Sequence, residues 1–293
     1  MAAGVSEARV AVFGASSLVG RHLLQLLPQH KYRVVAFSRS ARRAPSEYVT
    51  WHFPSSSSGD DSLGEVTDCL SVAPIWELPQ YFDWFEAHRV RRIVALSSTS
   101  RFTKLESPVA ADRYVAERLE LAETALESWA TRRGVRWLIL RPTLIYGCGH
   151  DKNITEIMRF VRRFGCFPLL GEASGLRQPI HAKDVAEYCV RALVRNAFVD
   201  RAYNISGGEI LSYREMVQRV FICAGRRPRF LPVPLQLFRL SLAGLRWVPY
   251  FHPQVLGMLE RMNQHMVFDS GDAIRDFDFV PRPFILTPDD MPK

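Results

Sequence analysis

The sequence has few cysteines, and none is arranged as a redox pair or a metal site. Its five cysteines are an odd number and show neither a CxxC pair nor the Cys/His spacing of a zinc site. We therefore expect reduced thiols, a cytoplasmic location and no bound metal.

Long hydrophobic runs are also missing. No window of about 18 uninterrupted apolar residues occurs, so we expect no integral membrane segment. The most apolar stretch, Leu231–Val255, is broken by prolines and two arginines, which leaves only peripheral membrane contact open. The first residues lack the basic and apolar regions of a secretory signal.

Acidic residues are outnumbered. Lys and Arg total 38 and Asp and Glu 30, which gives a formal net charge of +8. This surplus suits anionic partners such as phosphates, nucleic acid or acidic lipid, without selecting one of them. With 47% hydrophobic and 23% charged residues, the chain has the composition of a folded globular protein, and disorder is excluded.

Apolar runs of strand length alternate with helical stretches through the first two-thirds of the chain. The expected strands are Arg9–Phe13, Arg33–Ser38, Thr67–Ala73, Arg92–Ser97, Arg136–Arg141 and Arg201–Ile205. These runs are continuous, as in strands buried on both faces of a parallel sheet. The clearest helix runs from Asp112 to Arg132. The pattern predicts an α/β fold with a doubly wound parallel sheet.

The composition of the sequence changes at Tyr146. Beyond this residue, glycine and proline become frequent, and the predicted helices carry basic and aromatic residues. Near Pro179–Asn204 the pattern returns to that of the sheet. We therefore predict two interleaved domains, residues 1–146 with 178–206, and residues 147–177 with 207–293.

The segment VAVFGASSLVGRHLL joins the first strand to a helix. Gly14 permits a tight turn, and Gly20 lets the helix pack closely on the strand. Amides at the helix start then face a pyrophosphate, and we assign them to Ser16, Ser17, Leu18 and Val19. Ser17 stands where such motifs have a middle glycine. The segment predicts dinucleotide binding, and the alternative is an ordinary strand-turn-helix connection.

Arg39 directly follows the second predicted strand, with Arg42 and Arg43 close behind. An acidic residue at this point binds the ribose 2′-hydroxyl of NAD, whereas an arginine can pair with a 2′-phosphate. NADP(H) is therefore favoured over NAD(H). The alternative is a solvated basic loop.

Several segments in order resemble the extended short-chain dehydrogenase/reductase family, the nicotinamide-dependent epimerases, dehydratases and reductases that mostly act on nucleotide sugars. They are VAVFGASSLVG, IVALSSTS, LRPTLIYG, RQPIHAKDVAEY, YNISGG and DFVPRPF. The resemblance covers nearly the whole chain. It implies a Rossmann-like cofactor domain and a smaller C-terminal lobe that binds the substrate.

The resemblance also implies site residues. Thr99 matches the family's catalytic hydroxyl, with Ser97 beside the cofactor, although Thr99 can also be a strand-end cap. Tyr114 and Arg118 match the tyrosine and lysine that exchange the proton, four residues apart on one helix face. Arginine replaces the lysine, and the segment between Thr99 and Tyr114 is short for the family, so Tyr114 can instead be an incidental exposed aromatic.

Other matches concern binding. Ala73, Pro74 and Pro142 resemble residues that line the cofactor. Asn153 and Arg177 resemble residues that meet a substrate diphosphate, with a helix cap and a surface charge as their alternatives. His181 more simply anchors the start of the next helix than acts as a base.

Three functions are compatible with these residues. The first is an NAD(P)-dependent reductase or epimerase acting on a small phosphorylated substrate such as a nucleotide sugar. The second is a cofactor-binding protein without turnover that acts as a sensor or assembly subunit. The third, nucleic-acid binding, rests only on basic-aromatic stretches such as MRFVRRFGCF, and we expect no nucleic-acid partner. A homodimer is an expectation from the resemblance alone.

Overall fold

The computed structural model describes residues 8–38, 46–52, 63–195, 200–233 and 261–292. The chain forms two compact units. The first comprises Met1–Pro142, Ala182–Ile205 and Asp269–Val280, and the second comprises Thr143–His181, Ser206–Phe268 and Pro281–Lys293. Arg39, Arg42 and Arg43, on which the NADP(H) prediction rests, and most of Leu231–Val255 lie outside the described residues.

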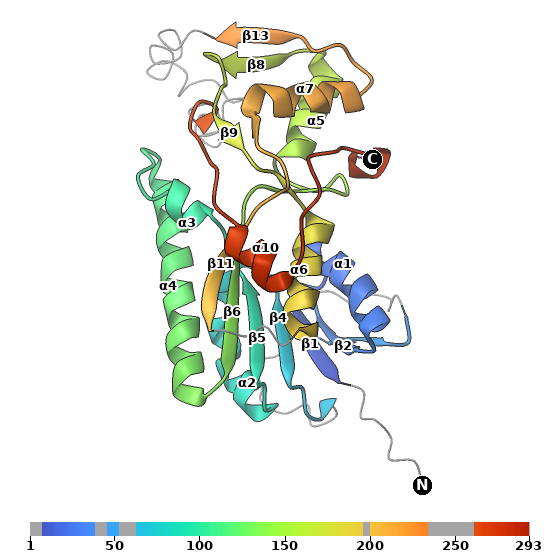
Figure 1. The fold of residues 1–293 in the computed structure, drawn as a ribbon, viewed down its shortest axis with the longest axis vertical. Helices are drawn as coiled ribbons and strands as arrows, with labels where there is room; N and C mark the ends of the chain where they lie inside the picture. Colours follow the sequence, from blue (N-terminus) through green and yellow to red (C-terminus); the bar gives the residue numbers. More distant parts are fainter. Residues whose placement is uncertain (1–7, 39–45, 53–62, 196–199, 234–260, 293) are drawn as a thin grey trace. The chain divides into compact units, whose positions relative to one another are not determined.

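The first unit is built on a seven-stranded sheet (Figure 1). All its strand pairs are parallel, which confirms the predicted fold class. In spatial order the strands are β11 (Arg201–Ile205), β6 (Arg136–Pro142), β5 (Arg92–Leu96), β4 (Asp68–Ser71), β1 (Arg9–Phe13), β2 (Arg33–Phe37) and β3 (Val49–His52). Six of them are the predicted strands, and the sequence analysis missed β3, an edge strand of four residues.

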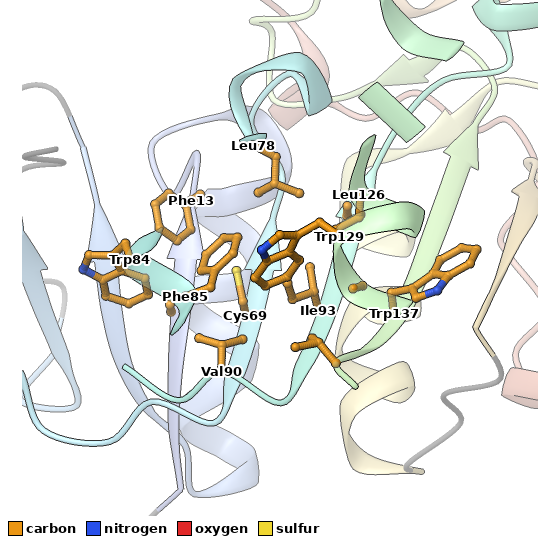
Figure 2. Packing of buried hydrophobic residues seen from close by; sticks show 14 of the residues in the cluster. Phe13, Cys69, Leu78, Trp84, Phe85, Val90, Ile93, Leu126, Trp129 and Trp137 are labelled. Atoms are coloured by element: carbon orange, nitrogen blue, oxygen red, sulfur yellow. The ribbon is translucent and has the colours of Figure 1, made fainter. Parts of the chain in front are cut away.

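Both faces of this sheet are buried. On one face, alternate strand residues such as Phe13 and Ile93 pack with Trp84, Phe85 and Trp129 in a continuous hydrophobic cluster (Figure 2). The helices that supply these side chains are α2 (Phe82–Ala87) and α4 (Ala110–Arg133), with the short turns η3 (Ile75–Glu77) and η4 (Pro79–Tyr81). On the other face α1 (Leu18–Leu26) and α6 (Ala182–Val194) pack against each other, and η1 (Leu27–His30) extends α1.

The strand order places a topological switch at β1, because the chain moves from β1 to β2 on one side and to β4 on the other. In open parallel sheets, ligands bind at such a switch, beyond the carboxyl ends of the strands. We call this side of the sheet the carboxyl edge. It carries the Gly14 turn and the segment 97–103, which includes α3 (Ser100–Thr103).

The second unit has its own core, formed around fully buried side chains such as Tyr146, Val161 and Phe221. Its helices are α5 (Ile154–Phe164), α7 (Tyr213–Cys223) and the turn η6 (Pro288–Asp290). Its strands pair in twos, β7 (Ile145–Tyr146) with β10 (Ile180–His181), β9 (Leu176–Arg177) with β12 (Leu211–Ser212), and β8 (Phe167–Leu170) with β13 (Phe230–Val233).

The segment Asp269–Val280, which contains α10 (Gly271–Phe277), packs within the first unit although we had assigned it to the second domain. The Tyr203 hydroxyl donates to Asp276 at 2.7 Å, and the Tyr188 hydroxyl donates to the Phe279 carbonyl at 3.3 Å. The phenylalanines of this segment thus complete the side of the sheet that carries α6, a long-range contact that local sequence patterns do not reveal.

No helix in the described ranges is long and apolar enough to cross a bilayer.

Candidate cofactor and active site

The turn after β1 is pressed against the end of β4. Gly14 has a φ of 75°, and a Cβ at this position would lie 2.5 Å from the amide nitrogen of Ala73. The neighbouring backbone leaves no room for any side chain, because the atoms it would meet belong to the main chain of Val72 and Ala73. This position therefore requires glycine both for its left-handed backbone and for the close approach.

The helix that follows, α1, lies equally close to the backbone of this turn. A Cβ at Gly20 would lie 2.3 Å from the Gly14 carbonyl oxygen. Ser17 is the N-cap of α1, and its hydroxyl accepts a hydrogen bond from the Gly20 amide at 3.1 Å. Its φ of −69° is open to any residue, so a serine stands here without strain and adds a cap. The missing middle glycine is thereby explained.

Thr99 and Pro142 meet at the ends of β5 and β6. Both the amide and the hydroxyl of Thr99 donate to the Pro142 carbonyl, at 3.1 and 3.2 Å. Thr99 is buried and precedes α3, but its side chain makes no capping bond to that helix. Its hydroxyl oxygen keeps its acceptor lone pairs. The structure thus brings together two predicted site residues, and Ala73 with the exposed Pro74 lies beside the Gly14 turn on the same edge.

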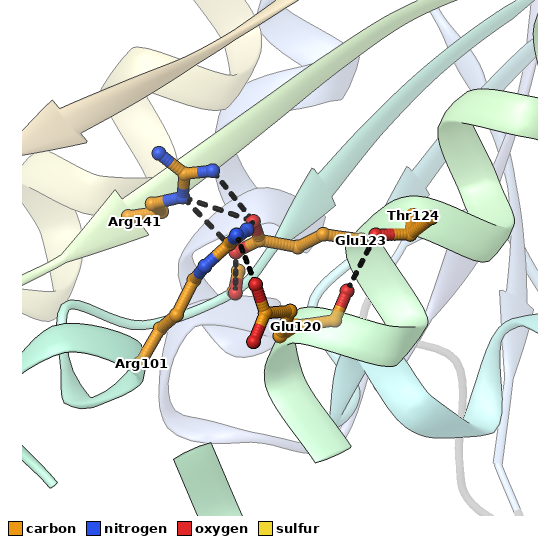
Figure 3. A network of polar contacts seen from close by, with 6 residues as sticks. Arg101, Glu120, Glu123, Thr124 and Arg141 are labelled. Carbon is orange, nitrogen blue, oxygen red and sulfur yellow. Dashed lines mark hydrogen bonds and ion pairs between the residues drawn. The ribbon is translucent and has the colours of Figure 1, made fainter. Parts of the chain in front are cut away.

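A buried ionic network centred on Glu123 of α4 was missed by the sequence analysis, and Figure 3 shows its two arginines, Arg101 and Arg141. The Ser97 hydroxyl donates to the same Glu123 carboxylate at 2.5 Å. Arg141 of β6 donates to both oxygens of the same carboxylate, and Arg101 of α3 donates to it as well. Burial alone would raise the pKa of Glu123, but hydrogen bonds from Arg141 and Ser97 leave this pKa below its ordinary value. The signal in the sequence was a carboxylate inside the apolar stripe of α4.

Tyr114 and Arg118 approach each other as their spacing predicts. The guanidinium carbon of Arg118 lies 5.6 Å from the ring centre of Tyr114 and 4.5 Å from that of Trp76. The arginine is therefore stacked between two aromatic rings, and Tyr114 is 58% exposed. The role of this pair stays a prediction.

The face of α4 that meets the strand ends is identified by Glu123, because its carboxylate reaches Ser97. Leu119 and Val115 lie four and eight residues earlier on the same face, and both pack in the hydrophobic cluster. Tyr114 is one residue from Val115, which is a rotation of about 100° around the helix. The two positions of this face that precede Glu123 are thus apolar, and Tyr114 lies to one side of the face.

In the second unit, Asn153 occupies the N-cap position of α5 but its side chain makes no capping bond. The capping group is Asp151, whose carboxylate accepts from the amides of Asn153 and Thr155 at 2.9 and 3.1 Å and from the Thr155 hydroxyl at 2.7 Å. Asn153 thus stands at the predicted cap position, but its exposed side chain does not cap the helix, and Asp151 supplies the capping oxygens.

Arg177 is only 4% exposed, so it is not a surface charge. Its guanidinium donates to the carbonyls of Leu176, Arg261 and Gln264, and it stacks over the Tyr213 ring at 5.3 Å. Desolvation by burial lowers the pKa of Arg177 to about 10. Burial raises the pKa of Tyr213, whose hydroxyl is buried without a hydrogen-bond partner. Within the described part of the second unit, Arg177 has no carboxylate partner.

His181 directly precedes α6, as expected of a residue that anchors this helix. Its Nε2 lies 3.1 Å from Oδ1 of Asp290, near the end of the chain. The same oxygen accepts from the Cys148 amide at 3.2 Å. Although burial opposes ionisation of Asp290, hydrogen bonds from His181 and Thr287 lower its pKa to about 2. These contacts make His181 a structural anchor within the second unit.

The residues present offer no metal centre, since no group of three or more His, Cys, Asp or Glu converges anywhere in the described ranges. All five cysteines are free. The site is instead built from backbone amides, hydroxyls and arginines, which are donors suited to phosphate groups and to the hydroxyls of a nucleotide.

The parallel sheet with its glycine turn defines a Rossmann-like fold. Residues 80–206 match the model of the NAD dependent epimerase/dehydratase family. This match confirms, for residues 80–206, the resemblance seen in the motifs of the chain.

Two curated relatives align with most of the chain. The mitochondrial NADH dehydrogenase [ubiquinone] 1 alpha subcomplex subunit 9 of Arabidopsis thaliana is 22% identical over 94% of this chain and 75% of its own length. The NAD(P)H azoreductase of Xenophilus azovorans is 23% identical over 80% of this chain and 81% of its own length.

Solved structures share the fold. The UDP-N-acetylglucosamine 4-epimerase of Bacillus cereus superposes with a TM-score of 0.69 at 16% identity, over 94% of each chain. MoeE5 in complex with UDP-glucose and NAD superposes with a TM-score of 0.67 at 21% identity, over 94% of each chain. At these identities the likeness supports the architecture of the chain and not its substrate.

Proposed function

We propose that this protein binds NAD(P)(H) at the carboxyl edge of its sheet and acts as a reductase or epimerase on a small phosphorylated substrate such as a nucleotide sugar. The observation that carries the proposal is the Gly14 turn, where a side chain would collide with the backbone of residues 72 and 73. A turn held this tightly at a switch point brings the start of α1 to the place where a pyrophosphate binds.

The start of α1 offers the donors for that pyrophosphate. Because Ser17 caps the Gly20 amide, the amides of Leu18 and Val19 are the helical donors without an intrahelical acceptor. Ser16 and Ser17 extend the same turn. Ala73, Pro74, Ser97 and Pro142 line the remainder of the proposed cofactor site on the ends of β4, β5 and β6.

When bound, the cofactor supplies or accepts the hydride. In this proposal the Thr99 hydroxyl, at the end of β5, exchanges its bond to the Pro142 carbonyl for one that it donates to the reacting oxygen of the substrate. Tyr114 exchanges the proton, and Arg118 supplies the positive charge beside its ring.

Arg177 and Asn153 are the proposed substrate-binding residues. Of the five guanidinium N–H groups of Arg177, three are used by the carbonyls of residues 176, 261 and 264, which leaves two donors for a phosphate oxygen. The unpartnered Tyr213 hydroxyl offers a third. A buried cation without a carboxylate partner favours an anionic substrate.

The test combines binding and turnover. We expect NADPH to bind the wild-type protein at micromolar concentration in a fluorescence titration, and Gly14→Ala to abolish this binding. Absorbance at 340 nm across a panel of nucleotide sugars and keto sugars then measures turnover. Wild-type protein that binds neither NADPH nor NADH would overturn the proposal.

The preference for NADP(H) is a separate part of the proposal, supported by the sequence around Arg39. We expect Arg39→Ala to weaken NADPH binding about tenfold or more, because a charge-assisted pair with the 2′-phosphate is lost, and to leave NADH binding unchanged. The preference for NADP(H) would be contradicted if Arg39→Ala lost equal affinity for NADPH and NADH, or if the wild-type protein bound NADH more tightly than NADPH.

A second candidate function is cofactor binding without turnover, as in a sensor or assembly subunit. The observation that favours it is that Val115 and Leu119, two turns and one turn before Glu123 on the same face of α4, pack in the hydrophobic cluster and offer no polar group for the chemistry. Tight NADPH binding with no turnover in the panel selects this function, and any turnover that falls with Tyr114→Phe selects the first. A cytoplasmic location and a homodimer stay predictions, which fractionation and light scattering would test.

A further inference from the structure

One end of the second unit gathers six arginines, and we call it the basic end. It is formed where the end of α5 meets the segment between α7 and β13, because Arg226 donates to the Arg162 carbonyl at 3.1 Å and the Phe167 amide donates to the Arg229 carbonyl at 2.9 Å. The arginines are Arg159, Arg162, Arg163, Arg226, Arg227 and Arg229, and all are exposed.

The two segments that form this end carry no negative charge of their own, although the acidic turn η6 is near, because Arg162 donates to the Pro292 carbonyl at 2.8 Å. The sequence contains no Asp or Glu from Ile157 to Gly171, and none from Met216 to Val233. In the ranges that the structure describes, only Arg159 of the six has a carboxylate partner, its neighbour Glu156 on the same helix. Two arginines in the last turn of α5 complement the helix dipole, but Arg226, Arg227 and Arg229 have no such role.

Apolar side chains stand among these charges. Phe164 is 54% exposed at the end of α5, and its ring centre lies 4.6 Å from that of Phe160, one helical turn earlier. The guanidinium of Arg163 lies 5.3 Å from the Phe164 ring. Leu231, two residues beyond Arg229, is 52% exposed. Exposed aromatic and aliphatic groups of this size cost solvation free energy unless something covers them.

We propose that the basic end is a docking surface for a membrane that contains anionic lipid. The arginines meet the lipid phosphates and carboxylates, and Phe160, Phe164 and Leu231 enter the boundary between headgroups and acyl chains. Clustered arginines with interspersed aromatic and aliphatic residues are the composition of peripheral membrane surfaces. The proposal uses only described residues and does not depend on residues 234–260.

A nucleic acid carries negative charge as an anionic membrane does, but it does not offer the apolar environment of a bilayer. Interfaces with nucleic acid are polar and wet, and single-stranded chains stack their bases on aromatic rings within a groove. Here the aromatic rings pack on each other and on an arginine, and the exposed aliphatic Leu231 has no counterpart in such a groove. The apolar component therefore favours the bilayer.

This surface lies apart from the proposed catalytic residues in the sequence and rests on none of them, so it stands or falls independently of the proposed function. A protein docked in this way would act at a membrane surface, where substrates with a lipid or lipid-linked anionic group are concentrated.

The test is co-sedimentation of the full chain with vesicles of phosphatidylcholine alone or with 30% phosphatidylserine, at 0.1 M salt. We expect binding only to the vesicles that contain phosphatidylserine. Arg163→Glu with Arg227→Glu should reduce this binding at least tenfold, because each arginine near an anionic surface contributes roughly fivefold in affinity. Arg163→Lys with Arg227→Lys keeps the charge and should retain most of the binding.

The matched control is Arg89→Glu with Arg132→Glu, two exposed arginines of the first unit, with the same change in net charge. We expect this control to bind nearly as well as wild type. Phe164→Ser should lower the fraction bound at high salt, where the apolar contribution remains. Equal circular dichroism spectra establish that each variant is folded, and Arg163→Gln with Arg227→Gln replaces the reversal if it unfolds.

Three results would overturn the proposal. The first is absence of binding to either vesicle, and the second is equal loss in the control and the Arg163/Arg227 variants, which would reduce the effect to net charge. The third is binding to a DNA duplex or to single-stranded RNA at 0.1 M salt that exceeds vesicle binding and is lost in the Arg163/Arg227 variant, which would assign the surface to nucleic acid.

Discussion

The Gly14 turn and the first half of α4 belong to the same carboxyl edge, but they are constrained in different ways. At Gly14 the main chain of Val72 and Ala73, directly after β4, leaves space for a hydrogen atom and nothing larger. On α4, the face toward the strand ends carries Val115 and Leu119, which pack as ordinary core residues, while Tyr114 stands exposed on the flank.

This difference means that the residues proposed to bind the cofactor and those proposed to transfer the proton depend on different properties of the structure. A turn that positions a dinucleotide depends on backbone geometry, so it persists as long as the glycines do. Proton transfer depends on a single side chain that must point in one direction, and a shift of one position on a helix turns it by about 100°. The binding half of the site, which is the Gly14 turn with the start of α1, is therefore strongly defined by the fold. The chemical half, which is Tyr114 with Arg118, depends on the direction in which these two side chains point.

The largest expected effect comes from Gly14→Ala. The added methyl group would meet the backbone of Ala73 at a left-handed φ, so we expect about 2–4 kcal/mol lower stability and loss of cofactor binding. Urea unfolding and NADPH titration measure the two effects.

The matched control is Gly134→Ala, at a φ of 65° with no atom within 4 Å of the added Cβ. It should cost only about 1 kcal/mol, because conformation alone is changed. If the two variants behave alike, the close approach at Gly14 is not what defines the turn.

Glu123→Gln tests the ionic network that joins α4 to Ser97, Arg101 and Arg141 at the carboxyl edge. Loss of the buried carboxylate leaves Arg141 and Arg101 with a neutral acceptor, and we expect about 2–3 kcal/mol lower stability in urea unfolding. Glu127→Gln, one turn further along α4 and exposed, should lie within about 0.5 kcal/mol of wild type. A similar small effect for Glu123→Gln would show that the network does not hold the carboxyl edge.

Acid sensitivity extends the comparison to the second unit. The pKa of Asp290 is lowered to about 2 in the folded state, so its stabilising contribution is present above the ordinary carboxyl pKa and is lost as pH falls from about 4 to 2. We expect Asp290→Asn to cost up to about 2 kcal/mol at pH 7 and to flatten the decline in stability across this range. Unfolding curves at pH 2–7 measure it, and an unchanged slope in the variant would contradict the assignment.

Tyr114→Phe gives the smallest effect on the folded protein and the sharpest test of the chemical half. Because Tyr114 is exposed, we expect stability within about 0.5 kcal/mol of wild type and unchanged NADPH affinity. If Tyr114 exchanges the proton, kcat falls at least about a hundredfold with KM unchanged. Full turnover by the variant would remove Tyr114 and Arg118 from the mechanism.

Much of the first unit could be predicted from local patterns. Continuous apolar runs identified six of seven strands, and the glycine turn identified the edge at which we propose that the cofactor binds. The strand Val49–His52 was missed because it is short and mixes polar with apolar residues, and it is recognised only by its pairing with β2.

The sequence predicted which segments form the candidate site, but it did not predict all the contacts within that site. Thr99, Pro142 and the Gly14 turn do lie on one edge, whereas the contribution of Glu123 depends on a carboxylate folded under arginines from two other elements. Asp151 replaces Asn153 as the capping side chain because the loop geometry, not the residue type, decides which oxygen reaches the amides.

The sequence by itself determined the class of fold, the glycine turn after the first strand and the basic surplus, because strand hydrophobicity, glycine spacing and charge are properties of neighbouring residues. Only the tertiary structure decided which face of α4 meets the strand ends, which arginines gather in the basic end, and that Asp290 pairs with His181 from 109 residues away. These are long-range contacts, and their geometry exists only once separate elements have packed together.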